Sequence, residues 1–320
     1  MNRTNRAVLL IHGGAGTLLR SKMDEVQEAK YRGALQAILL AGEAQLAAGA
    51  AALDVVVEAV RQLEECELFN AGKGAVYTAA ATHELDACVM DGSNLQAGAV
   101  AGLSRTRNPV LAAQAVLRHS KHVMFVGAAA DALAASHGLE QVAPDWFGTK
   151  QRLEQLQRAQ LTDAGALLDH DGQAPIVEQS KFGTVGAVAL DLQGHLAAAT
   201  STGGMTNKAV GRVGDSPLIG AGCYANDATV AVSCTGTGEA FMRSCAAFDV
   251  SALMAYQGLS VQAAAELVVL EKLPKLGGTG GLIALAANGE FSLPFNTAGM
   301  YRGHVSLGNA PVVAIYRDEA

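Results

Sequence analysis

Runs of apolar residues, some alternating and some at helical spacing, divide the chain into strands and helices. The strand-like runs cover 7–11, 85–90, 97–103, 123–126, 184–191, 195–201, 229–235, 281–287, 290–295 and 311–316. Helical spacing covers 24–48, 53–63, 128–136, 150–161, 239–256 and 260–272, and Asn108 and Pro109 open one more helix. Short turns between strands imply antiparallel pairing. We therefore expect an α/β chain with two antiparallel sheets face to face and helices outside both.

The run 184–191 is the most informative of these segments. It is apolar from Val185 to Leu190, which is typical of a strand covered on both faces. A turn signal at 191–194 follows, and 195–200 returns as a partner strand. A polar segment, 162–182, precedes this hairpin. That segment is expected to be an exposed connector, where breaks in a chain are best tolerated.

Thr184 stands at the junction between the connector and the strand. A threonine freed as a new N-terminus is a nucleophile with its own base, because the unperturbed pKa of a free α-amine is about 7.7–8.0. On an intact chain the same residue is only the first of a hairpin. From this short segment alone, the hairpin interpretation is favoured.

Composition and charge exclude several classes of protein. The net charge is −7 and no basic block occurs, so nucleic acid is not expected as a partner. No apolar run reaches the roughly 18 residues of a membrane span, and the run 7–11 is too short for a signal peptide. The sequence has 5 cysteines, an odd number, and no Cys-x-x-Cys motif. We therefore expect reduced thiols in a cytoplasmic protein.

Two polar clusters follow the hairpin. Residues 200–208 (TSTGGMTNK) end the partner strand, so the hydroxyl of Thr202 is expected close to Thr184; the alternative is a simple turn. In 211–217 (GRVGDSP), the planar fork of Arg212 suits a carboxylate and Asp215 suits an ammonium group. Together they could clamp a free amino acid, and the alternative is an ordinary exposed ion pair.

A third cluster, 234–239 (CTGTGE), runs from a strand into a helix. The hydroxyl of Thr235 and the N–H of Gly236 are candidates to stabilise a developing oxyanion. The competing interpretation, a phosphate loop, lacks the lysine of a Walker motif. Neither a Gly-x-Ser-x-Gly elbow nor a paired zinc-ligand spacing occurs in the sequence.

Taken together, these segments resemble the plant-type L-asparaginase/isoaspartyl aminopeptidase family of N-terminal-nucleophile hydrolases. The resemblance runs along nearly the whole chain, in the same order and spacing. It rests on residues 11–16 (IHGGAG), 69–74 (FNAGKG), 183–186 (GTVG), 200–204 (TSTGG), 211–217 (GRVGDSP), 234–238 (CTGTG) and 294–297 (PFNT).

The resemblance implies a four-layer αββα sandwich in one domain, 1–320, cut by the chain itself between Gly183 and Thr184. The products would be an α-subunit, 1–183, ending in a flexible connector, 162–183, and a β-subunit, 184–320. The implied substrates are L-asparagine and β-aspartyl dipeptides, hydrolysed to L-aspartate through a β-aspartyl ester of the nucleophile, with no catalytic cofactor.

The resemblance also implies the role of each site residue. Thr184 would be the nucleophile, supported by Thr202, and Asn70 would place an amide nearby. Arg212 and Asp215 would bind the α-carboxylate and α-amine of the substrate. The oxyanion hole would consist of Thr235 and Gly236.

A structural sodium ion and a dimer of cleaved αβ units belong to the same expectation. The ion would be held by backbone carbonyls of the loop that contains Leu63, Glu64, Cys66, Phe69, Ala71 and Lys73. Position 73 departs from the apolar residue frequent in bacterial members, and a positive charge there would weaken cation binding.

Three alternatives remain open on the same fold. Glycosylasparaginase favours an Asp before the threonine and a secreted chain with disulfides. The threonine endopeptidase of this fold has a much longer connector. A non-cleaving amino-acid binder would keep the fold without the nucleophile chemistry.

Overall fold

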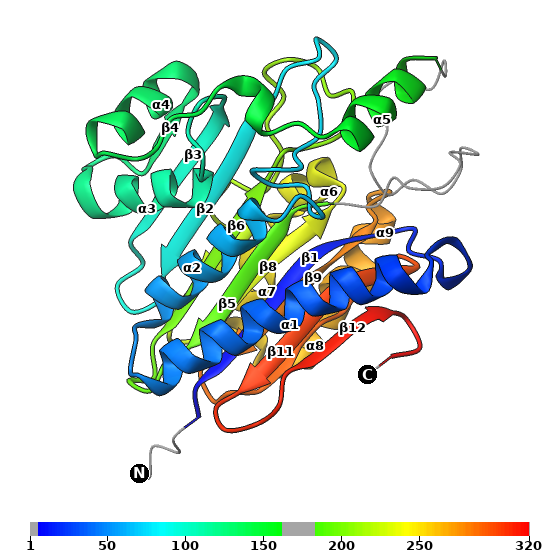
Figure 1. Cartoon of the computed structure of the whole chain (residues 1–320). Coiled ribbons are helices and arrows are strands. Elements are labelled where there is room, and N and C mark those ends of the chain that lie inside the picture. Colours follow the sequence, from blue (N-terminus) through cyan, green and yellow to red (C-terminus); the bar gives the residue numbers. More distant parts are fainter. Residues whose placement is uncertain (1–5, 162–182, 320) are drawn as a thin grey trace.

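The computed structural model describes residues 6–161 and 183–319 and contains two sheets packed face to face (Figure 1). The strand order of the large sheet is β12-β11-β1-β5-β6-β2-β3-β4. Its strands are β1 (Val8–Gly16), β2 (Leu85–Asp91), β3 (Ala97–Leu103), β4 (Met124–Val126), β5 (Val185–Leu190), β6 (Leu196–Thr202), β11 (Gly299–Ser306) and β12 (Val312–Tyr316). The small sheet, in the order β10-β9-β8-β7, consists of β7 (Cys223–Ala225), β8 (Val230–Gly236), β9 (Gly280–Ala286) and β10 (Phe291–Ser292).

Helices cover the outer faces of both sheets (Figure 1). The large sheet is covered by α1 (Glu25–Ala47), α2 (Ala52–Glu65), α3 (Pro109–His119) and α4 (Gly127–Ser136). The small sheet packs against α6 (Gly238–Ser244), α7 (Ala246–Gln257), α8 (Val261–Glu266) and the π-helical turn Leu267–Lys272. The short α9 (Leu273–Lys275) packs against α6 and the π-helical turn. The remaining elements are α5 (Lys150–Leu161) and the 3-10 turns Arg20–Lys22 and Pro144–Trp146.

The alternation of side chains along each strand divides the core into layers. On β1, Leu9 and Ile11 pack with the helices over the large sheet, whereas Val8 and Leu10 face the small sheet. Successive residues of a strand point to opposite faces, and both faces are covered here, so both sets are apolar. The arrangement confirms the expected α/β fold, with two sheets between layers of helices.

Several boundaries differ from the sequence prediction. β1 does not end in a turn at His12 but continues to Gly16, because a bulge between His12 and Gly14 keeps it paired with β11. The strands β7 and β11 were not predicted, and the strand expected over 290–295 is only Phe291–Ser292. The helix expected over 239–256 is two helices, since Cys245 adopts a left-handed conformation with φ 48°.

The pairing of β3 with β4 is parallel, so the expectation of antiparallel pairing is wrong for this edge of the sheet. A helix, α3, connects these two strands, whereas antiparallel neighbours are joined by short turns. The connector predicted over 162–182 lies outside the described residues. Within 6–161 and 183–319, no helix combines the length and hydropathy needed to cross a membrane.

The central position of β5 determines where the site forms. β5 pairs with β1 on one side and with β6 on the other, and β8 of the small sheet packs over it. Thr184 directly precedes β5, and the register Val185↔Ser201 brings it to the end of β6 that carries Thr202. Two threonines from adjacent strands therefore meet at one end of the sandwich.

Candidate active site

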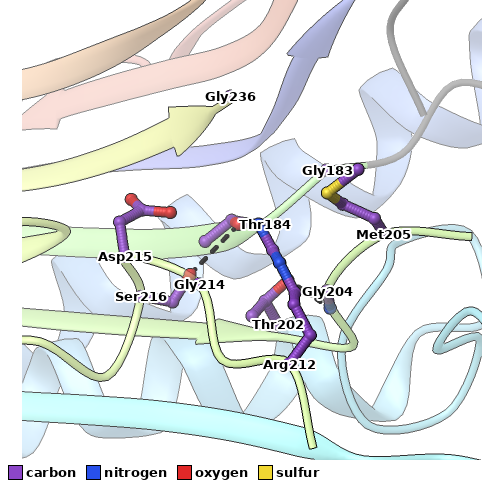
Figure 2. A pocket seen from close by; sticks show the side chains of 10 residues that line it. All are labelled: Gly183, Thr184, Thr202, Gly204, Met205, Arg212, Gly214, Asp215, Ser216 and Gly236. Atoms are coloured by element: carbon purple, nitrogen blue, oxygen red, sulfur yellow. Dashed lines mark hydrogen bonds between the residues drawn. The ribbon is translucent and has the colours of Figure 1, made fainter. Parts of the chain in front are cut away.

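Thr184 lies in the wall of a small pocket at this end of the sandwich (Figure 2). It is 6% exposed, and its Oγ1 lies 3.2 Å from the Oγ of the buried Ser216. The pocket is lined by Gly183, Thr184, Thr202, Gly204, Met205, Arg212, Gly214, Asp215, Ser216 and Gly236. Residues from the connector, two strands and two loops thus surround the hydroxyl of one threonine.

The Thr202 side chain shapes the turn that follows β6 and lines the pocket beside Thr184. Its Oγ1 accepts a hydrogen bond of 2.9 Å from the backbone N–H of Gly204. The carbonyl of Gly204 accepts a bond of 2.7 Å from the side-chain amide of Asn70. Asn70 also accepts from the N–H of Val76, so it anchors this turn and has no hydrogen bond to Thr184 in the described part of the chain.

Close contacts near Thr184 leave no room for a side chain at two glycines. A Cβ added at Gly14, where φ is +110°, would lie 2.6 Å from the backbone nitrogen of Gly183. A Cβ at Gly186 would lie 1.9 Å from the Oγ of Ser233 and 2.5 Å from the Nε2 of His12. The bulged end of β1 therefore packs directly against the segment that carries Thr184.

A buried polar chain lies beneath the same segment. His12 Nε2 is 2.9 Å from Ser233 Oγ, which is 2.7 Å from the hydroxyl of Thr200. Burial lowers the pKa of His12 to about 3, and the backbone of Thr184 offsets this only partly. The imidazole is therefore neutral at pH 7. Its hydrogen bond to Ser233 joins β1 to β8.

The two charged residues of the predicted clamp both line the pocket, but they form no ion pair with each other. Arg212 donates from Nε and Nη2 to Oε1 of Glu239, at 3.0 and 2.8 Å. Asp215 is 3% exposed, and its Oδ2 has no hydrogen-bond partner among the described residues. The interpretation of an ordinary exposed Arg–Asp pair is therefore wrong, since one residue is buried and the other binds a different carboxylate.

The buried carboxyl of Asp215 is suited to bind a cation. Burial raises the pKa of its carboxyl to about 7, although the positive charge of Arg212 opposes the rise. A buried carboxyl with an unpartnered oxygen gains from an ammonium group placed against it. Together with Arg212, it offers opposite charges to the two α-groups of an amino acid.

The predicted oxyanion residues stand at the end of β8. Gly236 lines the pocket, whereas Thr235 is fully buried behind it and its Oγ1 has no hydrogen-bond partner in the described residues. A buried hydroxyl without a partner is unusual in a folded protein.

Carbonyl oxygens of the loop predicted to hold sodium lie close to two of its glycines. A Cβ added at Gly72 would lie 2.5 Å from the carbonyl oxygen of Glu64, and one at Gly74 would lie 2.7 Å from that of Phe69. The carbonyls of Leu63, Glu64 and Cys66 also accept backbone N–H groups, which leaves each a second lone pair. Oxygen donors of this kind fit a hard cation. In the described ranges, no group of His, Cys, Asp and Glu side chains could hold a metal.

The sequence is similar along nearly its whole length to a known family of hydrolases. A family model described as "Asparaginase" matches residues 5–315. The chain belongs to this asparaginase family. The isoaspartyl peptidase of Escherichia coli is 60% identical over 314 residues, which cover 98% of this chain and 97% of that protein. The isoaspartyl peptidase of Salmonella typhimurium is also 60% identical over 98% of this chain and 100% of its own length. A putative isoaspartyl peptidase/L-asparaginase of Dictyostelium discoideum is 49% identical over 95% of this chain and 94% of its own length.

As a member of the asparaginase family, the chain is a hydrolase with a small-molecule substrate. Sequence reasoning placed its principal pocket residues but missed three others. Ser216 and Glu239 stand inside the quoted motifs, directly after Asp215 and Gly238, yet nothing in the spacing showed what they contact. His12 was part of the first motif, and only the pairing of β1 with β5 brings it under Thr184.

Proposed function

We propose that this asparaginase-family hydrolase activates itself by cleavage before Thr184 and then hydrolyses L-asparagine and β-aspartyl dipeptides to L-aspartate. The observation that carries the proposal is the placement of the Thr184 hydroxyl in a pocket that also contains Arg212 and buried Asp215. Opposite charges beside one nucleophile suit a substrate with a free α-carboxylate and α-amine.

Maturation begins with the hydroxyl of Thr184 attacking the carbonyl carbon of Gly183. The hydroxyl proton passes to the Thr184 nitrogen, the peptide C–N bond breaks, and an ester joins the two residues. Water then hydrolyses the ester, which leaves a carboxylate on Gly183 and a free hydroxyl and amine on Thr184. Gly183 suits this step because glycine adopts backbone conformations that other residues resist.

Hydrolysis uses the same hydroxyl. Thr184 Oγ1 attacks the side-chain carbonyl of the substrate, and its proton passes to the Thr184 amine and from there to the leaving ammonia or amino acid. Thr235 and the N–H of Gly236 stabilise the oxyanion, while Thr202 holds the nucleophile. Water then attacks the β-aspartyl ester and releases L-aspartate. The branched Cβ of Thr184 restricts its side-chain rotation, which favours a fixed attack direction.

The clamp explains why both substrate types fit one site. Arg212 binds the α-carboxylate of the aspartyl half, and Asp215 binds its α-ammonium. Neither residue contacts the leaving group, so ammonia and an amino acid are both accepted. Asn70 supports the turn that carries Gly204 at the pocket edge.

Further features complete the proposal. The mature protein would be a dimer of αβ units, 1–183 and 184–320, in the cytoplasm, in line with its five free cysteines. A structural sodium ion would be bound by the carbonyls of Leu63, Glu64, Cys66, Phe69, Ala71 and Lys73 and would stiffen the loop beside Asn70. No catalytic cofactor is invoked.

The decisive experiment follows the new N-terminus and the activity in the same sample. Purified protein is incubated, its fragments are sequenced, and hydrolysis of L-asparagine, β-aspartyl-leucine and an N-glycosylated asparagine is measured side by side. A fragment beginning at Thr184 with activity on the first two supports the proposal. Full activity of an uncut chain, or cleavage of a Thr184→Ala chain, would overturn it, and preference for the glycosylated substrate would favour the glycosylasparaginase alternative.

A further inference from the structure

Glu239, in the first turn of α6, occupies one edge of the Arg212 guanidinium. Both hydrogen bonds, from Nε at 3.0 Å and from Nη2 at 2.8 Å, end on the same carboxylate oxygen, Oε1. The side chain of Arg212 is 17% exposed and that of Glu239 is 51% exposed. The pair therefore lies at the mouth of the pocket, with the carboxylate on the solvent side.

The other edge of the guanidinium remains available to the pocket. A guanidinium carries five N–H donors, and Glu239 engages only the Nε and Nη2 side. A Cβ added at Gly214 would lie 3.0 Å from Nη1, and one at Gly238 would lie 2.9 Å from Nη2. The planar guanidinium thus lies close to the backbone at Gly214 and at Gly238, and both contacts limit its movement.

A carboxylate that enters the pocket would meet Arg212 at the Nη1 edge while Glu239 remains on the opposite edge. We propose that Glu239 is a resident carboxylate that shares Arg212 with the α-carboxylate of the substrate and thereby weakens the binding of substrates and of the product L-aspartate. This inference rests on the proposed function, because it takes Arg212 as the group that binds the α-carboxylate.

The two halves of the clamp are consequently unequal. The charge of Arg212 is already balanced by Glu239 before a substrate binds, whereas the buried Asp215 has an oxygen without a partner in the described residues. The α-ammonium therefore supplies most of the attraction, and the α-carboxylate binds beside a like charge. Weaker binding of the carboxylate favours release of L-aspartate, which carries the same α-groups as the substrates.

Glu239 could instead act only by orienting the fork, and two variants separate the roles. Glu239→Gln keeps an oxygen that accepts from Arg212 but removes the charge, and Glu239→Ala removes both. If the charge weakens binding, Glu239→Gln lowers the KM for L-asparagine and the inhibition constant of L-aspartate by about fivefold at low ionic strength. The difference from wild type shrinks in high salt because the pair is half exposed.

The α-amide of L-asparagine provides the internal control, because it lacks the α-carboxylate. Its KM should be the same in wild type and Glu239→Gln. Glu266→Gln removes an equal charge from a residue that pairs with Gln262 rather than with Arg212, and it should leave all constants unchanged. Each protein is first checked for complete cleavage by gel.

An increase in KM in Glu239→Gln as large as in Glu239→Ala would make Glu239 an orienting residue only and would overturn the inference. An unchanged KM for L-asparagine, or an equal fall for the α-amide, would overturn it as well. If wild type hydrolyses neither L-asparagine nor β-aspartyl-leucine, the proposed function fails. Calorimetry with L-aspartate on wild type and Glu239→Gln then still tests Glu239, with about fivefold tighter binding expected in the variant.

Discussion

The hydroxyl oxygens of Thr184 and Ser216 lie 3.2 Å apart in a buried pair that joins the start of β5 to the loop carrying Asp215. The Thr184 hydroxyl, the proposed nucleophile, is thus hydrogen-bonded to a residue adjacent to the one expected to bind the α-ammonium. Any shift of this loop would move the attacking oxygen and the substrate clamp together. Ser216 is part of the pocket wall, and under the proposed function it would also position the attacking hydroxyl.

Ser216→Ala should slow both self-cleavage and kcat by about two- to tenfold, because a neutral hydrogen bond contributes about 0.5–1.5 kcal/mol. The measurements are fragment formation over time and steady-state rates with L-asparagine. Ser251→Ala is a matched control, since Ser251 is also buried and bonded to a threonine hydroxyl, that of Thr229, at 2.7 Å. Equal effects of the two substitutions on the rates would contradict a specific role for Ser216.

Asp215 should make the binding of L-aspartate depend on pH. Burial raises the pKa of this carboxyl to about 7, with Arg212 opposing the rise and the charges of Glu239 and Asp86 adding to it. Below that pKa the carboxyl is neutral and loses its attraction for an ammonium group. We expect the inhibition constant of L-aspartate to rise about tenfold from pH 8 to pH 6.

Asp215→Asn should bind L-aspartate weakly at both pH values and lose most of this dependence. The variant also controls for the Thr184 amine, which titrates in the same range. A wild-type constant that does not change between pH 6 and 8 would contradict the assignment of Asp215.

The hairpin formed by β5 and β6 could be predicted from the sequence because its signal is local. The apolar run 185–190 and the turn at 191–194 predict the hairpin whose register brings Thr184 to Thr202. The partners of Arg212 could not be predicted this way. Glu239 reaches it from a helix that follows the small sheet, so the contact depends on how two layers pack.

The first motif illustrates the same limit. A glycine-rich run at 12–16 indicates a turn when read alone, yet it forms the bulged end of β1. Pairing with β11, itself missed in the sequence, holds this segment extended. The glycines are needed for contacts with Gly183 and with the Phe69 ring, which no local pattern records.

Gly186→Ala should destabilise the protein by about 1–3 kcal/mol and slow self-cleavage, because the added methyl overlaps Ser233 and His12. The measurements are urea unfolding and fragment formation over time. Gly33→Ala is the matched control in the middle of α1, where a Cβ meets nothing within 4 Å. It should stabilise by about 0.5–1 kcal/mol through helix propensity. If Gly186→Ala unfolds and cleaves like the wild type, Gly186 does not pack tightly against Ser233 and His12.

Sodium should raise the melting temperature of the protein if the carbonyls of the 63–73 loop bind it. At ten times its dissociation constant a bound ion stabilises by about 1.4 kcal/mol, or roughly 2 °C for a chain of this size. Melting is compared in sodium and choline chloride at equal ionic strength. Lys73→Met removes a nearby positive charge and should enlarge the shift. Identical melting in both salts for both proteins would argue against a sodium site.

His12 should make the stability of the fold depend on pH. Burial lowers its pKa from 6.5 to about 3, so the neutral ring contributes stability that is fully present above pH 6.5 and is lost as the pH falls towards 3.

His12→Gln keeps a group that can reach the Ser233 hydroxyl but does not titrate. The variant loses packing against Gly186 and should be less stable than wild type at pH 7. Between pH 7 and pH 5 the difference should shrink by about 2 kcal/mol, because only the unfolded wild type gains a proton at this position. Urea unfolding of both proteins at the two pH values measures the difference, and one that stays constant would mean that the imidazole of the folded protein is charged or accessible to water.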